Sequence, residues 1–279
     1  MNTSRPSIVI GVATLPERRH FFENKCLPSL KEQADQVVVY HDLTENDDLP
    51  SHTYPNVTRI SASPFTWGDA GKFLGYNLWN NNGHDFYFFS CDDDLIYPPD
   101  YCERMIEWIE YFERKAVVSL HGSYLTQFPI KSYYHDRRSV PCLGDCEDVV
   151  RVIFPGTGCT AFHNSTVQPW VSEFKTRNMA DLWFGFKLQK EKIPAIVLPH
   201  SGDYLTYNPD LPLTETIWGQ ENQNDFVQTA LVNQFSLEQG FQLLPFPVPL
   251  VEKDLFKERP APLIPSVRRL AKRRHFWST

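Results

Sequence analysis

The chain has 279 residues, of which 42% are hydrophobic and 22% charged, and its formal net charge is −7 at pH 7. A chain of this length buries one substantial core, since domains hold on the order of 100 to 200 residues. The acidic balance argues against a nucleic-acid partner, because proteins that neutralise phosphates carry a basic excess. The longest apolar run near the N-terminus, residues 8–13, is too short for a membrane span or a secretory signal, so we expect a cytoplasmic location.

The first half of the chain alternates short apolar runs with helix-like segments, a pattern typical of βαβ units and a mostly parallel sheet. The run 85–91 is apolar almost throughout, which is typical of a central strand covered on both faces. The expected strands are 7–14, 36–43, 57–63, 85–91 and 116–124, with helices within 15–34 and over 68–83 and 98–115. In the last of these, Met105, Ile109 and Phe112 form one apolar stripe.

The second half gives weaker signals. We expect irregular structure over 125–153, a glycine-bearing loop and short strand over 154–164, a helix over 179–192 and a strand over 193–200. The domain is expected to span 1–245. A Pro-rich strap and a basic tail would follow over 246–279.

The six cysteines show no repeated pair spacing of the zinc type, so we expect free, buried thiols. Cys142 and Cys146, in "CLGDC", leave two alternatives open, a small disulfide or half of a metal site.

Three consecutive carboxylates, Asp92, Asp93 and Asp94, follow the apolar run 85–91. Their mutual repulsion beside an apolar strand demands a compensating cation. In extended backbone Asp92 and Asp94 project to one side, at the strand end where ligands of open α/β sheets bind. Two carboxylates suit Mg²⁺ or Mn²⁺, which takes further ligands from water and a diphosphate.

Other roles can be assigned to these motifs. The carboxylates lie too far upstream of Pro98 to cap the next helix, and a calcium loop would need glycine where Tyr97 stands. A solvated acidic turn stays open. The stretch "GDAGKF", residues 68–73, resembles part of a phosphate-binding P-loop. That loop would need glycine where Thr66 stands and a hydroxyl residue where Phe73 stands.

In layout, residues 7–205 resemble a GT-A glycosyltransferase, in particular the family-2-like enzymes that build bacterial surface polysaccharides. The resemblance rests on a first strand ending in "TLPER", a second ending in "HDL", a helix beginning "GDAGK", and Asp92-Asp93-Asp94 as the Asp-x-Asp motif. It implies a Rossmann-like α/β domain with a C-terminal extension. The nucleotide-sugar half would be 1–124 and the acceptor half 125–245.

The resemblance also implies site residues. Donor binding would fall to Thr14, Arg18, Asp42, Asp69, Lys72, Asp92 and Asp93, and the metal, Mn²⁺ or Mg²⁺, to Asp92, Asp94 and His200. Plainer roles are open for several of these: a surface charge for Arg18, a helix cap for Asp69, a solvated helix position for Lys72 and a structural histidine for His200, with Asp203 as an alternative ligand.

An inverting transferase needs a base for the acceptor hydroxyl, and Asp181, near the start of helix 179–192, has the expected setting. Asp181 could instead be only an N-cap, in which case a retaining enzyme becomes plausible. Gly156 and Gly158 in "PGTGC" would let backbone approach a sugar or phosphate on the acceptor side.

The expected activity is transfer of a sugar from a UDP- or GDP-linked donor to a hydroxyl of a glycan or lipid-linked glycan. A nucleotidyltransferase acting on sugar phosphates and a non-catalytic glycan- or membrane-binding subunit are the alternatives. The basic residues of 268–277 could lie on the inner face of a membrane, adding about 1 kcal/mol for each near-surface charge. They could equally form a solvated tail or a partner-binding arm.

Overall fold

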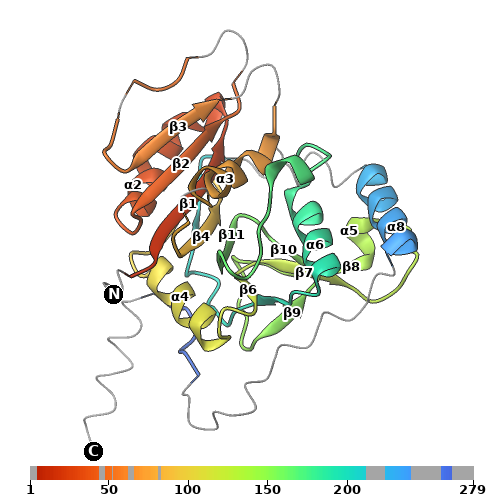
Figure 1. Ribbon diagram of the computed structural model, residues 1–279. Coiled ribbons are helices and arrows are strands. Elements are labelled where there is room, and N and C mark those ends of the chain that lie inside the picture. Colours follow the sequence, from red (N-terminus) through yellow and green to blue (C-terminus); the bar gives the residue numbers. More distant parts are fainter. Residues whose placement is uncertain are drawn as a thin grey trace, which may run out of the picture.

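The computed structural model describes residues 5–43, 48–51, 53–61, 66–80, 83–211, 224–239 and 259–265 (Figure 1). Its centre is an eight-stranded, mostly parallel sheet in the order β3-β2-β1-β4-β11-β6-β12-β9, in which β11 and β9 run antiparallel to their neighbours. The strands are β1 Ser7–Thr14, β2 Gln36–His41, β3 Val57–Ser61, β4 Phe86–Cys91, β6 Val117–Ser119, β9 Val150–Val152, β11 Cys159–His163 and β12 Ala195–Val197. With helices on both faces, this α/β architecture is compatible with a Rossmann-like fold.

Two small sheets accompany the central one. The first joins β10 Phe154–Pro155, β7 Gly122–Leu125 and β8 Arg137–Val140, and the second joins β13 Thr206–Tyr207 to β5 Leu95–Ile96. The α-helices are α1 Arg19–Phe21, α2 Leu27–Lys31, α3 Leu74–Asn80, α4 Tyr101–Tyr111, α5 Tyr133–Asp136, α6 Ala180–Glu191 and α8 Phe226–Gln239. The described residues also contain the helical segments η1 Pro16–Arg18, η2 Phe22–Cys26, η3 Gly68–Phe73 and η4 Val171–Glu173, which are of the 3₁₀ type except for the π-helical η2.

The alternation of side chains along the strands divides the core into two layers. Ile10 on β1 and Phe89 on β4 face the layer that also holds residues of α2 and α4, whereas Phe88 faces the layer of η3, α3 and α6. Successive side chains of a strand point to opposite faces, so a strand that is apolar throughout is covered on both sides. The prediction that 85–91 is such a central strand is confirmed, because all six residues of β4 are buried.

The predicted strand 116–124 is divided in the structure. Its first part forms β6 in the central sheet, and its second part forms β7 in the small sheet. Between them, the Ser119 side-chain Oγ accepts a hydrogen bond from the His121 backbone N–H at 3.1 Å. That bond takes a donor that a continuing strand would offer to its neighbour, and β6 ends there.

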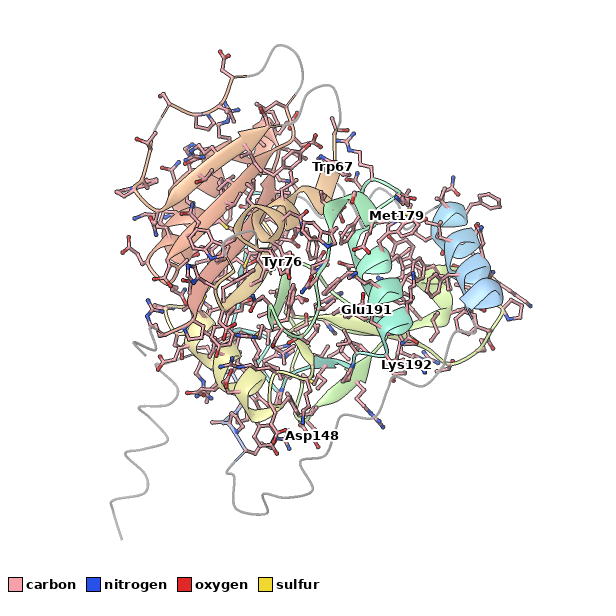
Figure 2. All side chains as sticks on the ribbon, in the orientation of Figure 1. Trp67, Tyr76, Asp148, Met179, Glu191 and Lys192 are labelled. Atoms are coloured by element: carbon pink, nitrogen blue, oxygen red, sulfur yellow. The ribbon has the colours of Figure 1, made fainter. Side chains whose placement is uncertain are left out.

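The region 125–153 is more ordered than predicted, since it contains α5, β8 and β9. Helix α6 agrees with the predicted helix 179–192. It follows Met179 and ends at Glu191, before the C-cap residue Lys192, which has the left-handed φ of 59° (Figure 2).

Part of the Pro-rich strap packs on the domain. Leu263 is fully buried and bridges to His200, and Arg259 Nη2 lies 2.5 Å from Oδ1 of Asp148, the residue labelled in Figure 2. The basic residues 268–277, for which the sequence predicts a membrane contact, lie outside the described residues.

Segment η3 packs so closely on β1 that Gly11 has no space for a side chain. A Cβ there would lie 2.0 Å from the Lys72 backbone oxygen. We therefore expect Gly11→Ala to destabilise the fold by about 1–3 kcal/mol, measured as a lower urea midpoint. Gly75→Ala is the milder comparison, because its Cβ would meet Val38 Cβ at 3.2 Å and Gly11 Cα at 3.3 Å, contacts that shifts of a few tenths of an ångström relieve. Equal midpoints for the two variants would contradict this packing.

Candidate functional site

A pocket of about 570 Å³ lies at the edge of the central sheet where three neighbouring strands end. Thr14 ends β1, Asp42 follows β2, and Asp92 follows β4, and all three residues line the pocket. Ligands of open α/β sheets bind at the carboxyl ends of the strands. The pocket therefore lies where the sequence predicts a ligand.

Most of the predicted site residues meet in this pocket. Its lining includes Thr14, Arg18, Asp42, Asp69, Lys72, Asp92, Asp93, Asp94, Gly156, Gly158 and Asp181. His200 and its alternative Asp203 are not part of the lining.

His200, predicted as a metal ligand, is not brought into the pocket that the carboxylates line. The residue is 3% exposed, and its backbone bridges to Cys146 and Leu263. Its ring nitrogens face backbone oxygens, Nδ1 at 2.7 Å from Leu198 and Nε2 at 3.3 Å from Pro141. A neutral imidazole has one N–H, so one of these nitrogens donates a hydrogen bond, and the buried ring lies among backbone oxygens outside the pocket lining.

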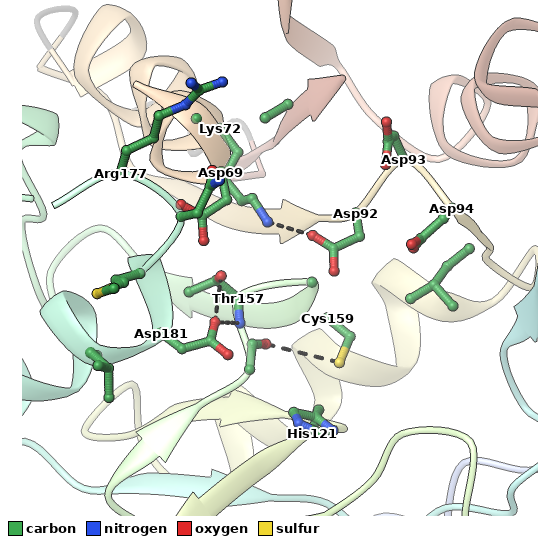
Figure 3. Close-up of a pocket in the computed structure, with 18 of the residues that line it drawn as sticks. Asp69, Lys72, Asp92, Asp93, Asp94, His121, Thr157, Cys159, Arg177 and Asp181 are labelled. Atoms are coloured by element: carbon green, nitrogen blue, oxygen red, sulfur yellow. Dashed lines mark hydrogen bonds and ion pairs between the residues drawn. The ribbon is translucent and has the colours of Figure 1, made fainter. Parts of the chain in front are cut away.

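The three carboxylates leave the strand in a turn, not in extended backbone. Strand β4 ends at Cys91, and Asp93 and Asp94 lie in the turn before β5. The side chains nevertheless separate as predicted: Asp92 and Asp94 point the same way, and Asp93 points away from them (Figure 3).

Two basic side chains of the protein compensate this turn. Lys72, which is 2% exposed, forms an ion pair with Asp92. Arg18 Nη1 lies 2.9 Å from Asp93 Oδ1 and 3.5 Å from Asp94 Oδ2. The sequence analysis expected Lys72 and Arg18 to contact the nucleoside, with a metal balancing the turn. In the structure, Lys72 and Arg18 supply part of the positive charge that compensates the three carboxylates.

The compensation is incomplete. Burial, followed by the charges of Asp92 and Asp93, raises the pKa of Asp94 to about 8 despite the nearby Arg18. Among the described residues, the lining holds six carboxyl groups, those of Asp42, Asp69, Asp92, Asp93, Asp94 and Asp181, and the basic groups of Arg18, Lys72, Arg137 and Arg177. An additional cation would therefore be electrostatically favourable.

The carboxylates of the pocket could supply only part of the ligands of Mg²⁺ or Mn²⁺. In the described part of the chain, no group of three or more His, Cys, Asp or Glu side chains is arranged to hold a metal ion. Hard cations that keep waters and take substrate phosphates need only one or two carboxylates. Asp92 and Asp94, whose side chains are 43% and 14% exposed, could provide these.

The glycines of the loop between β10 and β11 make space for protein side chains, not only for a ligand. A Cβ on Gly158 would lie 2.0 Å from Asp92 Oδ2, and a Cβ on Gly156 would lie 2.4 Å from the His121 ring. The sequence analysis assigned these glycines to close approach of the acceptor. In the structure they allow Asp92 and His121 to lie against the loop.

Asp181 is fixed by the same loop. Its Oδ1 accepts hydrogen bonds from the Thr157 backbone N–H at 2.7 Å and from the Thr157 hydroxyl at 2.6 Å (Figure 3). The N-cap position of α6 is Met179, and Asp181 is the second residue of the helix, within its first turn. The alternative that Asp181 is only the cap is therefore wrong, and its carboxylate is held at the pocket.

The cap of α6 comes from a distant segment. Asp69 Oδ2 accepts a hydrogen bond from the Ala180 backbone N–H at 3.0 Å, and Asp69 does not cap its own segment η3. Its other oxygen is buried without a hydrogen-bond partner among the described residues. Burial of the carboxyl raises the pKa of Asp69 to about 7, although Lys72 opposes the shift. Asp69 thus joins the start of α6 to the Lys72 side of the pocket.

Asp42 is also held by an ion pair. Its Oδ2 lies 2.5 Å from Arg177 Nη2, and its Oδ1 accepts a hydrogen bond from the Tyr40 hydroxyl at 3.3 Å. Asp42 is 6% exposed and the Arg177 side chain is half-exposed, and both residues line the pocket.

The sequence analysis missed several residues of the lining. Tyr133, Tyr134 and Arg137 come from "SYYHDRR", part of the region predicted to be irregular, and Gln228 comes from α8. An aromatic pair beside two arginines was a signal for the first three, because such side chains bind sugars and anions. No pattern in the sequence indicated Gln228.

All six cysteines are free, as predicted, but Cys142 differs from the rest because it lines the pocket and is only partly buried. A hydrogen bond from Cys159, together with one from His121, lowers the pKa of Cys142 well below its ordinary value in spite of burial. Burial raises the pKa of the other five thiols.

We therefore expect iodoacetamide to alkylate Cys142 at pH 6.5, because a thiol is a thiolate above its pKa and the thiolate is the nucleophile. Peptide mass spectrometry would locate the adduct. His121→Asn should slow the reaction at this pH by removing one hydrogen bond to the thiolate. Modification of Cys142 only at pH 9 and above would contradict the assignment.

No known family model matches the chain, and no curated protein matches it. No helix of the described ranges is long and apolar enough to cross a membrane. The function is therefore argued from the site.

Proposed function

We propose that the chain is a glycosyltransferase of the GT-A fold, which moves a sugar from a UDP- or GDP-linked donor to a hydroxyl of a glycan or lipid-linked glycan, with inversion. The strand order β3-β2-β1-β4 followed by the antiparallel β11 supports this proposal. The three carboxylates at the end of β4 support it further.

One observation carries the proposal. The acidic turn at the end of β4 and the carboxylate of Asp181 on α6 line the same pocket, although they lie on different elements. Transfer of a sugar requires a place for a diphosphate leaving group and a base for the acceptor hydroxyl. The acidic turn, with Lys72 and Arg18 beside it, suits the diphosphate. The carboxylate of Asp181 suits the role of the base.

The donor would lie against the acidic turn. Asp92 and Asp94 would hold Mg²⁺ or Mn²⁺, which supplies Lewis-acid stabilisation of the diphosphate when bound. Lys72 orients the Asp92 carboxylate through their ion pair. Arg18 forms an ion pair with Asp93 and keeps that carboxylate turned away from Asp92. Thr14 and Asp42, at the neighbouring strand ends, would contact the nucleoside.

Asp181 would act as the base. Its Oδ1 accepts both Thr157 hydrogen bonds, so Oδ2 can take the proton of the acceptor hydroxyl. The acceptor oxygen then forms a bond to the anomeric carbon of the donor. The bond from that carbon to the diphosphate oxygen breaks, and its electron pair leaves with the nucleoside diphosphate.

Calorimetric titration of UDP and GDP into the protein tests the donor site. We expect one of them to bind in the presence of Mn²⁺ or Mg²⁺ and not in EDTA, and Asp94→Asn to weaken this binding. Asp85→Asn is the matched control, because Asp85 is exposed just before the opposite end of β4. Absence of metal-dependent binding in a folded sample would overturn the proposal.

A further inference from the structure

A second part of the pocket is built by α5 and β8. Tyr133, Tyr134 and Arg137 line it, and Tyr133 packs in one apolar cluster with Met179 and Leu182. These last two residues flank the Ala180–Asp181 pair in the sequence. This part of the pocket therefore lies beside the start of α6, where Asp181 is held.

Arg137 lies over two aromatic rings. Its guanidinium carbon is 4.6 Å from the centre of the Tyr134 ring and 4.9 Å from that of Tyr133, and its Nη1 donates a hydrogen bond to the Tyr133 hydroxyl at 3.4 Å. Cation–π contacts of this kind fix the plane of a guanidinium. Its charge is thus presented to the pocket in a defined orientation.

Arg137 differs from the other basic residues of the lining in its charged neighbours. Arg18, Lys72 and Arg177 each form an ion pair with a carboxylate of the pocket. Within the ranges that the structure describes, Arg137 forms an ion pair with no carboxylate. Its stacked guanidinium therefore has donors available for an oxyanion.

The support beneath Arg137 is fixed by α8 and by Asp225, the residue just before this helix. Asp225 Oδ2 accepts hydrogen bonds from the Ser132 hydroxyl at 2.6 Å and from the Tyr134 backbone N–H at 2.8 Å. Thr229 Oγ1 accepts one from the Tyr133 backbone N–H at 2.9 Å. A rigid platform loses little conformational entropy on binding, which is the property of a preorganised site.

We propose that Arg137 binds an anionic group of the acceptor, a carboxylate or phosphate attached to its sugar, with Tyr133 and Tyr134 forming the aromatic wall beside it. The inference rests on the proposed function and names the acceptor class of the same site. A planar guanidinium matches carboxylate and phosphate oxygens with paired hydrogen bonds. The many carboxylates of the pocket would repel such a group wherever no cation faces it.

The test is binding of four acceptor probes, measured by saturation-transfer NMR and calorimetry on the full chain with UDP or GDP and Mn²⁺ present. A glucuronate-terminated disaccharide is compared with its glucose-terminated counterpart. An octyl-phosphate-linked sugar is compared with the neutral octyl glycoside. We expect at least one anionic probe to bind about tenfold or more tightly than its neutral partner, as charged hydrogen bonds usually provide. The pair that shows the preference identifies the carboxylate or the phosphate.

Substitutions in β8 distinguish the role of Arg137 from that of its neighbour Arg138. Arg137→Gln should abolish the preference for the anion, and Arg137→Lys should keep part of it. Arg138→Gln should leave it unchanged, because Arg138 is the next residue of β8 and its side chain is exposed. Nucleotide binding should be equal in all variants, which also shows that they are folded.

The outcomes separate this inference from the proposed function. If UDP or GDP binds with metal but neither anionic probe is preferred, or if Arg137→Gln keeps the preference, the inference is overturned and the donor site stands. If no nucleotide binds, the proposed function is overturned and the inference falls with it.

Discussion

Asp181→Asn is expected to lower kcat by a factor of about 10²–10⁴ while leaving nucleotide affinity unchanged. Asparagine keeps an oxygen that can accept both hydrogen bonds of Thr157, at 2.7 and 2.6 Å in the native protein, so the local structure should persist. The amide nitrogen that replaces Oδ2 cannot take a proton. Steady-state kinetics with the donor identified by binding would measure the loss.

The control for this substitution is Glu191→Gln, at the opposite, exposed end of α6. It removes one carboxylate from the same helix without touching the pocket and should leave kcat unchanged. Should Asp181→Asn retain full kcat, Asp181 would serve only to hold the Thr157 loop, and a retaining mechanism without this base would be favoured.

Gly158→Ala is expected to weaken metal-dependent nucleotide binding by about 10–100-fold, although it changes no charged group. The added Cβ would lie 2.0 Å from Asp92 Oδ2, which is too close for both atoms, and would force the carboxylate out of its place. Loss of a well-placed charged hydrogen bond costs about 1.5–3 kcal/mol, which corresponds to that change in affinity. Calorimetry with Mn²⁺ measures it directly.

Two comparisons show whether the loss arises at Asp92. Asp92→Asn alone and the double variant Gly158→Ala/Asp92→Asn should bind the nucleotide equally weakly, because both alter the same carboxylate. Gly75→Ala, at the second position of α3, would place its Cβ against Val38, Gly11 and Phe88 and not against Asp92, so it should bind like the native protein. Normal binding by Gly158→Ala would mean that the Asp92 carboxylate is not part of the donor site.

Local patterns in the sequence were sufficient for much of the framework. Strand β1 has the predicted bounds, and the apolar run that became β4 is buried on both faces, because burial in a parallel sheet leaves a continuous apolar signature. The position of the carboxylates at a strand end followed from the same pattern. All but one of the predicted site residues line one pocket.

The pairing of charges could not be derived from the sequence. Lys72 and Arg18 lie 20 and 75 residues from their nearest carboxylate partners, and only the tertiary fold brings them together. For the same reason Asp69 was expected to cap its own segment, whereas it caps α6 across 111 residues. His200 does not line the pocket, and a position after the end of a strand does not say which way the ring turns.

The most direct test of the account is a turnover assay with a panel of UDP- and GDP-sugars and glycan acceptors in the presence of Mn²⁺ or Mg²⁺. The account predicts a glycosylated product together with free UDP or GDP, loss of both in EDTA, and their near loss in Asp181→Asn. Pyrophosphate release from UTP or GTP with a sugar phosphate, and no glycosylated product from any donor, would contradict it and identify a nucleotidyltransferase instead.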